Sequence, residues 1–353
     1  MVKRLSEIRK DYLANRWVIL APERAKRPSD FAVSRVKAKP RVCSFCPGRE
    51  NLTPPAKLLY VLRRSKIMKL SDRGGRRRSD WRVRCIPNLY PALSLPIYRS
   101  ATKTQGRFPY IGERPTGVHE IIIESPRHDD HPHRASESQI ELWLRAAIDR
   151  MGELGHLEST QSMALFRNHG REAGASVTHA HSQIITTPVI PARIEQEQQT
   201  MKKFHDESGC CALCQIRSTE SRSDRKILST EAFSVFAPWA SIFPFEFWIV
   251  PKRHSNSPLD LSRDEARDLA KTIRLSFGAL ANILADPPYN SIFHLATSRF
   301  SDGVFHWHIE VYPKVSVHAG FELGTGMYVN TLKPEAAAQV LASAVKNEAS
   351  NRN

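Results

Sequence analysis

Two stretches of the sequence resemble each other: EIIIESPRH at residues 120–128 and EFWIVPKRH at residues 246–254. In both, a β-rich run ends at a proline, a basic residue and a histidine, and a further proline follows four residues later. A helix-like segment and a His-x-His pair come next, and the pair begins 51 residues after His128 and 52 residues after His254. A pattern repeated at nearly equal spacing predicts a duplicated unit.

The segments that follow the two stretches predict helices. Ser136 with Gln139, and Ser262 with Glu265, have the spacing of a capping box, and apolar residues then recur every three or four positions. Further helices are expected over 192–206 and 334–347. The alternation of strands and helices predicts two copies of an α+β unit with antiparallel strands.

Four of the six cysteines form two CxxC pairs. No apolar run reaches the roughly 20 residues that span a bilayer. The first 22 residues contain no signal-peptide core, so we expect a cytoplasmic protein with no membrane partner and reduced thiols. With two histidines from each half, the pairs make two tetrahedral zinc sets: Cys43, Cys46, His128 and His179, then Cys211, Cys214, His254 and His306. The alternative is free thiols beside surface histidines.

The chain of 353 residues has 52 Lys and Arg against 36 Asp and Glu, a formal charge of +16. Eleven basic and two acidic residues lie between Lys57 and Arg84, where Gly74 and Gly75 predict a turn between two strands. Such a charge admits nucleic acid or phosphorylated ligands. We interpret the stretch as a solvated basic hairpin.

The sequence LFRNHGREAGASVTHAHSQII at 165–185 carries the chemistry. It predicts a strand, a turn rich in Gly, Ala and Ser, and a second strand that places His179, His181 and Gln183 on one face. Small residues at Gly174 and Ser176 let the backbone approach an anion closely. An imidazole beside such a turn can attack phosphorus.

We expect the two histidines of this motif to have different roles, one as a metal ligand and one as the nucleophile. If His179 binds zinc, it cannot also be the nucleophile, which leaves His181 for that role. Gln183 offers an amide N–H to a phosphoryl oxygen without supplying an acidic proton. The alternatives are that both histidines bind one metal, or that both are exposed strand residues without a chemical role.

With these motifs the chain resembles the galactose-1-phosphate uridylyltransferase family, the transferase branch of the histidine-triad superfamily. The similarity runs nearly end to end and includes the motifs at 24–28, 43–46, 87–91, 125–128, 168–183, 306–308, 312–313, 320–322 and 334–337. It implies two histidine-triad-like halves, 1–190 and 191–353, which form one continuous, mainly antiparallel sheet flanked by helices. It also implies a homodimer.

The resemblance implies a ping-pong reaction of galactose metabolism. His181 attacks the α-phosphorus of UDP-glucose, and the uridylyl-histidine then gives its nucleotide to a hexose 1-phosphate. The matching positions that hold the phosphoryl group are Asn168, Gly174, Ser176 and Gln183. Those around the nucleotide are Arg24, Arg27 and Asn88, and Glu322 lies near the sugar.

Some positions depart from the better-known pattern. Tyr328 stands where those enzymes have a glutamine, and the second CxxC pair resembles the branch that contains plant ADP-glucose phosphorylase, which passes AMP to phosphate. We place uridylyl transfer first and adenylyl transfer second. A nucleotide hydrolase would have a third histidine in place of Gln183. A zinc-stabilised nucleic-acid-binding protein would leave residues 168–183 unexplained, so nucleic acid is an unlikely partner.

A further metal site occurs in some members of the family. Glu197, His294 and His308 fall near its positions, but Glu310 replaces a histidine, and the sequence does not decide whether a metal binds there. The second His-x-His pair also lacks a preceding glycine-rich turn, so the second half is interpreted as a structural copy without catalytic function.

Overall fold

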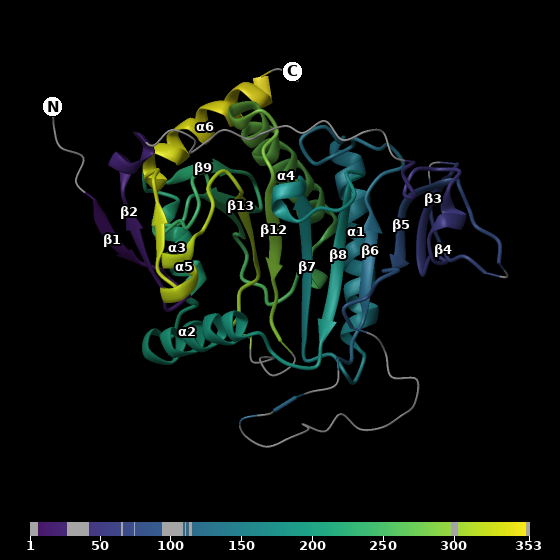
Figure 1. The fold of residues 1–353 in the computed structure, drawn as a ribbon, viewed down its shortest axis with the longest axis horizontal. Coiled ribbons are helices and arrows are strands. Elements are labelled where there is room, and N and C mark those ends of the chain that lie inside the picture. Colours follow the sequence, from purple (N-terminus) through teal and green to yellow (C-terminus); the bar gives the residue numbers. More distant parts are fainter. Residues whose placement is uncertain are drawn as a thin grey trace.

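Eleven antiparallel strands form the main sheet of the protein (Figure 1). The computed structural model describes residues 6–26, 42–64, 66–73, 75–93, 109, 111–112, 115–297 and 303–350. The strand order is β4-β3-β5-β6-β8-β7-β12-β13-β11-β10-β9. The strands that come before residue 190 are β3 Leu58–Arg63, β4 Lys66–Leu70, β5 Trp81–Pro87, β6 His119–Ile123, β7 Ser162–His169 and β8 His181–Thr187. The strands of the main sheet that come after residue 190 are β9 Lys226–Ser229, β10 Phe233–Phe236, β11 Phe247–Pro251, β12 Tyr289–His294 and β13 His308–Pro313. The predicted α+β class with one continuous antiparallel sheet is confirmed.

The two parts of the sheet meet between β7 and β12. These strands pair antiparallel, with Asn168 opposite Asn290 and Phe166 opposite Ile292. Every strand on one side of this seam comes from before residue 190, and every strand on the other side comes from after it. Backbone hydrogen bonds therefore join the two parts directly.

Helices cover one face of the sheet, which we call the helix face. They are α1 (Glu137–Gly155), α4 (Arg263–Leu284) and α6 (Pro334–Ser350), and their apolar side chains join the strands in one core. The predicted N-caps are confirmed, because the side chains of Ser136 and Ser262 accept hydrogen bonds from the backbone N–H groups three residues later. The helices expected over 192–206 and 334–347 are also present.

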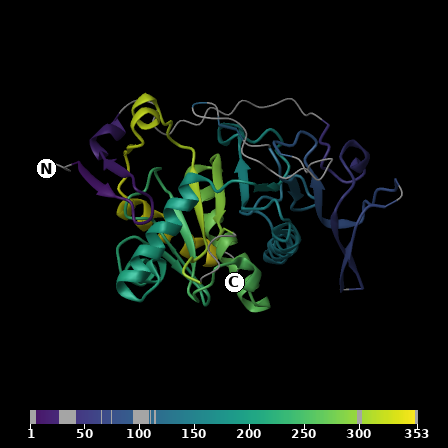
Figure 2. The same cartoon turned by 90° about the horizontal axis from the view of Figure 1, so that it is seen from below.

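The opposite face carries a second layer over only part of its length. A small sheet of β1 (Glu7–Lys10), β2 (Trp17–Leu20) and β14 (Tyr328–Asn330) packs on the β12–β13 region through Val18 and Leu20, which contact the cluster containing Tyr312. The helices α2 (Ala192–Ser208) and α5 (Gly320–Thr325) lie on the same side. Figure 2 shows the purple N-terminal strands across the sheet from α1. The first strands of the chain therefore pack with its second half.

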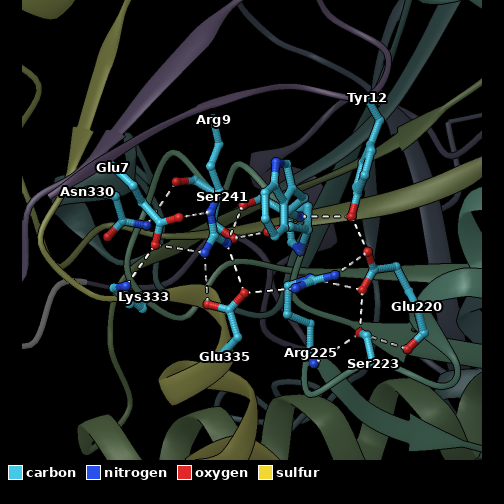
Figure 3. Close-up of polar contacts among 12 residues, drawn as sticks. Glu7, Arg9, Tyr12, Glu220, Ser223, Arg225, Ser241, Asn330, Lys333 and Glu335 are labelled. Carbon is cyan, nitrogen blue, oxygen red and sulfur yellow. Dashed lines mark hydrogen bonds and ion pairs between the residues drawn. The ribbon is translucent and has the colours of Figure 1, made fainter. Parts of the chain in front are cut away.

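Partly buried ion pairs attach this layer to the rest of the molecule (Figure 3). Arg9 of β1 is 2.9 Å from Glu335 at the start of α6, and its guanidinium lies 3.7 Å from the ring centre of Trp239. Arg225 bonds the same carboxylate at 2.8 Å and Glu220, at the end of α3 (Ala212–Glu220), at 2.9 Å. The network joins the N-terminal strands to the C-terminal helix.

The basic stretch forms the outer edge of the main sheet. Its hairpin is β3–β4, whose turn lies at Arg64, whereas Gly75 lies in the longer connection from β4 to β5. Since β3 lies between β4 and β5, the connection that contains Gly75 does not join neighbouring strands as the sequence suggested. Gly74 lies outside the described residues. Among the described helices, none combines the length and apolar character needed to cross a membrane.

Candidate functional site

The predicted catalytic residues lie on neighbouring strands at the centre of the sheet. Asn168 is in β7, and His181 and Gln183 are in β8, which pairs with β7 so that Phe166 lies opposite Gln183. Alternation along the strands puts Asn168, His181 and Gln183 on the face opposite the helices. We call this the site face.

His181 has a defined tautomer. Its Nδ1 lies 2.7 Å from the carbonyl oxygen of His179, so this nitrogen donates its proton and Nε2 keeps a free electron pair. Burial lowers the pKa of His181 to about 4, and the imidazole is therefore neutral near pH 7. A neutral imidazole with a fixed, unprotonated Nε2 can act as a nucleophile.

The turn before β8 has the form expected of an anion cradle. Gly170 and Gly174 have φ values of 81° and 85°, which disfavour larger residues, and a Cβ on Gly170 would lie 2.6 Å from Pro288. Ser176 is exposed on the same turn. Asn290, from the second half, holds this turn in place.

Asn290 is a residue that the sequence analysis missed. Its Nδ2 donates to Oδ1 of Asn168 and to the carbonyl oxygen of Ala173, both at 2.8 Å. These contacts cross the β7–β12 seam and fix the orientation of the Asn168 amide. Because 122 residues separate Asn290 from Asn168, no local motif points to it.

The first predicted metal set assembles beside the nucleophile strand. The Cys43 sulfur is 3.6 Å from His179 Nδ1, and the Cys46 sulfur is 3.5 Å from His128 Nδ1. A tetrahedral zinc with ordinary bond lengths separates sulfur and nitrogen ligands by about 3.6 Å. The donor set and its spacing therefore fit zinc.

The second ring nitrogens of these histidines have their own partners. Nε2 of His179 lies 2.8 Å from the carbonyl oxygen of Ser125, and Nε2 of His128 lies 2.9 Å from the hydroxyl of Thr178. A proton held at Nε2 leaves Nδ1 free to bind metal. Phe45, inside the CxxC turn, packs edge-on against His181 with ring centres 5.6 Å apart. The first Cys/His set therefore lies in contact with His181, the predicted nucleophile.

The second predicted set has the same geometry. The Cys214 sulfur is 3.4 Å from His306 Nδ1 and 3.7 Å from His254 Nδ1, and Cys211 is 3.7 Å from His306. Nε2 of His254 lies 2.6 Å from the carbonyl oxygen of Gly303. The structure thus brings together the predicted ligands of both sets, and each set fits a tetrahedral metal.

A third group occupies the site face of the second half. Ligand atoms of Glu197, His294 and His308 lie within 4.8 Å of one another. Arg193 from α2 bonds Glu197 at 3.1 Å and also pairs with Glu310. Burial would lower the pKa of His294, but Glu197 and Glu310 raise it to about 9. The two carboxylates are thus paired with Arg193 and His294, and Glu197, His294 and His308 also present the ligand atoms of a possible metal site.

Behind the nucleophile, a buried ion pair supports the strands from the helix face. Arg167 of β7 pairs with Glu124, and burial raises the pKa of that carboxyl group. Arg167 also bonds Tyr289 at 3.1 Å and His131 at 2.7 Å, and it lies 3.5 Å from the carbonyl oxygen of His181. The sequence analysis assigned no role to Arg167.

The predicted substrate residues divide into two groups. Asn88 lies close to Gln183, since the side chains of both contact His119. Arg24 lies in the short helix Pro22–Lys26 and is exposed, whereas Glu322 lies in α5 and is half-buried. Both elements lie with the small sheet, and α5 is far from β8 in Figure 1. Arg27 lies outside the described residues.

Comparisons with known sequences give the family. Residues 132–352 match a family described as "Domain of unknown function (DUF4921)". The chain is 34% identical to ADP-glucose phosphorylase from Arabidopsis thaliana, over 95% of this chain and 92% of that protein. It is 27% identical to galactose-1-phosphate uridylyltransferase from Thermotoga maritima, over 96% of this chain and 98% of that protein.

Solved structures agree with the sequence comparisons. The crystal structure of the Arabidopsis thaliana ADP-glucose phosphorylase with bound ADP-glucose matches with a TM-score of 0.79 and 32% identity, over 96% of this chain and 98% of that chain. A uridylyltransferase structure matches with a TM-score of 0.72 and 25% identity, over 97% and 99% of the two chains. By sequence and by fold, the chain belongs to the galactose-1-phosphate uridylyltransferase family of nucleotidyltransferases.

Proposed function

We propose that this protein transfers a nucleoside monophosphate from a sugar nucleotide to a phosphorylated acceptor through a covalent bond to His181. The observation that carries the proposal is the hydrogen bond from His181 Nδ1 to the His179 carbonyl, which leaves the Nε2 electron pair free. Asn168, Gln183 and the turn with Gly174 and Ser176 supply N–H and O–H donors for the phosphoryl oxygens.

The transfer has two steps that mirror each other. Nε2 of His181 bonds to the α-phosphorus while the bond from that phosphorus to the sugar-phosphate oxygen breaks, and the electron pair leaves with sugar 1-phosphate. An oxygen of the acceptor then attacks the same phosphorus, and the N–P bond breaks. The His179 carbonyl stabilises the positive charge on the ring between the steps, because it accepts a hydrogen bond from Nδ1–H.

We place ADP-glucose first as donor, with phosphate as acceptor. The higher identity to an ADP-glucose phosphorylase and the presence of the second Cys/His set support this choice. The second candidate is UDP-glucose with a hexose 1-phosphate such as galactose 1-phosphate, which the sequence motifs favoured and which the 27% identity to a uridylyltransferase supports. The two candidates differ in base and acceptor but share His181.

Intact-mass measurement after incubation with each sugar nucleotide tests the proposal. We expect an acid-labile gain of one AMP from ADP-glucose, a smaller labelled fraction from UDP-glucose, and no gain in His181→Ala. Phosphate should then remove the AMP. Labelling of the alanine variant, or no labelling from either donor, would contradict the mechanism. Faster labelling by UDP-glucose would make the second candidate the function.

We further propose that each Cys/His set binds one zinc ion, two per chain, as a structural rather than catalytic metal. Four protein ligands close each tetrahedron, and no position is left for substrate. Thiolate ligands of this kind suit a reducing compartment, in keeping with the expected cytoplasmic location. His179 would then hold the strand in register while His181 remains free to react.

We also propose a homodimer. Within one chain, Arg24 and Glu322 lie with the small sheet, at a distance from β8. If both contact substrate as the family motifs imply, they act on the His181 of a second copy. The proposal therefore joins two sets of predicted residues that a single chain keeps apart.

A further inference from the structure

His119 is the first residue of β6, the strand beside the nucleophile strand. It pairs with Ile185, and Ile121 pairs with Gln183, so His119 is a diagonal neighbour of Gln183 on the site face. Its Nε2 lies 2.8 Å from Oε1 of Gln183. Neither the motifs nor the comparisons assign this histidine a role.

The protonation of His119 follows from its backbone contact. The N–H of Ala92 donates to His119 Nδ1 at 3.2 Å, so Nδ1 is the acceptor and the proton of the neutral ring lies on Nε2. Two groups lie near that proton. The Asn88 amide nitrogen, at 3.0 Å, is no acceptor, because the Asn88 carbonyl oxygen is turned to the N–H of Tyr90. The Gln183 oxygen therefore takes the hydrogen bond.

This hydrogen bond decides which end of Gln183 faces the substrate. The two ends of an amide have almost the same shape, and an unrestrained glutamine can present either one. Its oxygen would repel a phosphoryl oxygen, whereas its N–H₂ stabilises one. Once Oε1 is held by His119, the nitrogen is the end left for a ligand beside His181.

We propose that His119 is a positioning residue that holds Gln183 with its amide N–H groups toward the phosphoryl group that His181 attacks. The inference rests on the proposed function, because it assigns Gln183 to that phosphoryl group. It extends the site by a residue that contacts neither the phosphorus nor a metal set.

Two substitutions of His119 separate its two nitrogens. His119→Gln places an amide nitrogen near the position of Nε2 and can still donate to Gln183. His119→Asn places an oxygen near the position of Nδ1 and can still accept from Ala92, but it does not reach Gln183. His156→Asn, on the exposed end of α1, is the matched control.

Single-turnover labelling by the sugar nucleotide that labels wild type gives the readout. We expect His119→Asn to lower the maximal labelling rate about 10- to 100-fold, with a smaller change in the half-saturating concentration, and His119→Gln to stay within about fivefold of wild type. Gln183→Ala should be at least as slow as His119→Asn, and the double variant no slower than Gln183→Ala, because His119 acts only through the Gln183 amide.

The possible failures are distinguishable. If wild type is not labelled, the proposed function fails. If wild type is labelled and His119→Asn keeps its rate, or if His119→Asn and Gln183→Ala multiply, the positioning role fails. A purely structural role would lower the melting temperature and metal content and would slow both His119 variants, which would also overturn the proposal.

Discussion

Arg167 shows how one buried residue can set the geometry of the nucleophile. It lies on the helix face of β7, directly behind the site, and neutralises Glu124 in a region without solvent. A buried ion pair contributes little net stability compared with apolar residues, but removal of one partner leaves the other charge uncompensated. Its contact with the His181 carbonyl links this charge balance to the catalytic strand.

We predict that Arg167→Met destabilises the protein by about 3–5 kcal/mol, because Glu124 is left buried without a counter-charge. Chemical denaturation at pH 7 measures the change. Adding Glu124→Gln to this variant should recover part of the loss, since the amide carries no charge. A loss below about 1 kcal/mol, or a double variant less stable than Arg167→Met, would contradict this account.

At the scale of elements, the two Cys/His corners differ in what lies next to them. The turn at residues 43–46 packs against the nucleophile strand through Phe45, next to the glycine-rich turn. The corner at residues 211–214 lies at the start of α3, and its partner His306 stands just before β13. On β13, His308 and Glu310 belong to the ion-pair group that contains Arg193. We therefore expect the first corner to support the proposed reaction and the second to support the fold.

We expect Cys43→Ser and Cys211→Ser each to lower the zinc content from two ions per chain to one. Cys43→Ser should also reduce nucleotide labelling of His181 by more than about 10-fold, because His179 and Phe45 lose their anchor. Cys211→Ser should lower the melting temperature and keep labelling within about threefold of wild type. Metal analysis and intact mass provide the measurements, and equal losses of labelling in the two variants would refute the division of roles.

At the scale of the whole molecule, one face of one sheet serves two purposes. Over β12 and β13 it is covered by α2 and the small sheet, and over β7 and β8 it presents the residues of the site. Arg24 and Glu322 belong to the covering layer. A dimer that packs this layer of one chain near β8 of the other would complete both sites.

Co-expression of His181→Ala with Glu322→Ala tests this arrangement. If Glu322 acts across the dimer, each variant alone is inactive. The co-expressed mixture should then recover about a quarter of the wild-type activity, because about half of the dimers are hybrids and one of the two sites in each hybrid is intact. Light scattering should show the mass of two chains. Hybrids without activity, or a monomer in solution, would contradict the proposal that Glu322 of one chain acts at His181 of the other.

The sequence could predict the parts of the structure that leave local signals. The N-cap serines Ser136 and Ser262 located α1 and α4, and the repeated spacing of CxxC pairs and histidines located both Cys/His sets, because ligand chemistry restricts residue type. No local sequence pattern predicts the roles of Asn290, His119 and Arg193, because their partners come near them only in the folded sheet. The pairing of β2 with β14 is likewise parallel and remote in sequence.

The hydrogen bonds from Asn290 to Asn168 and Ala173 also bear on how such proteins can be recombined. Because their motifs repeat, the two halves of the chain look interchangeable. They are not, because the second half donates an amide that fixes the first half's anion-binding turn. A chimera that joins the first half of this chain to the second half of a relative needs an asparagine opposite Asn168.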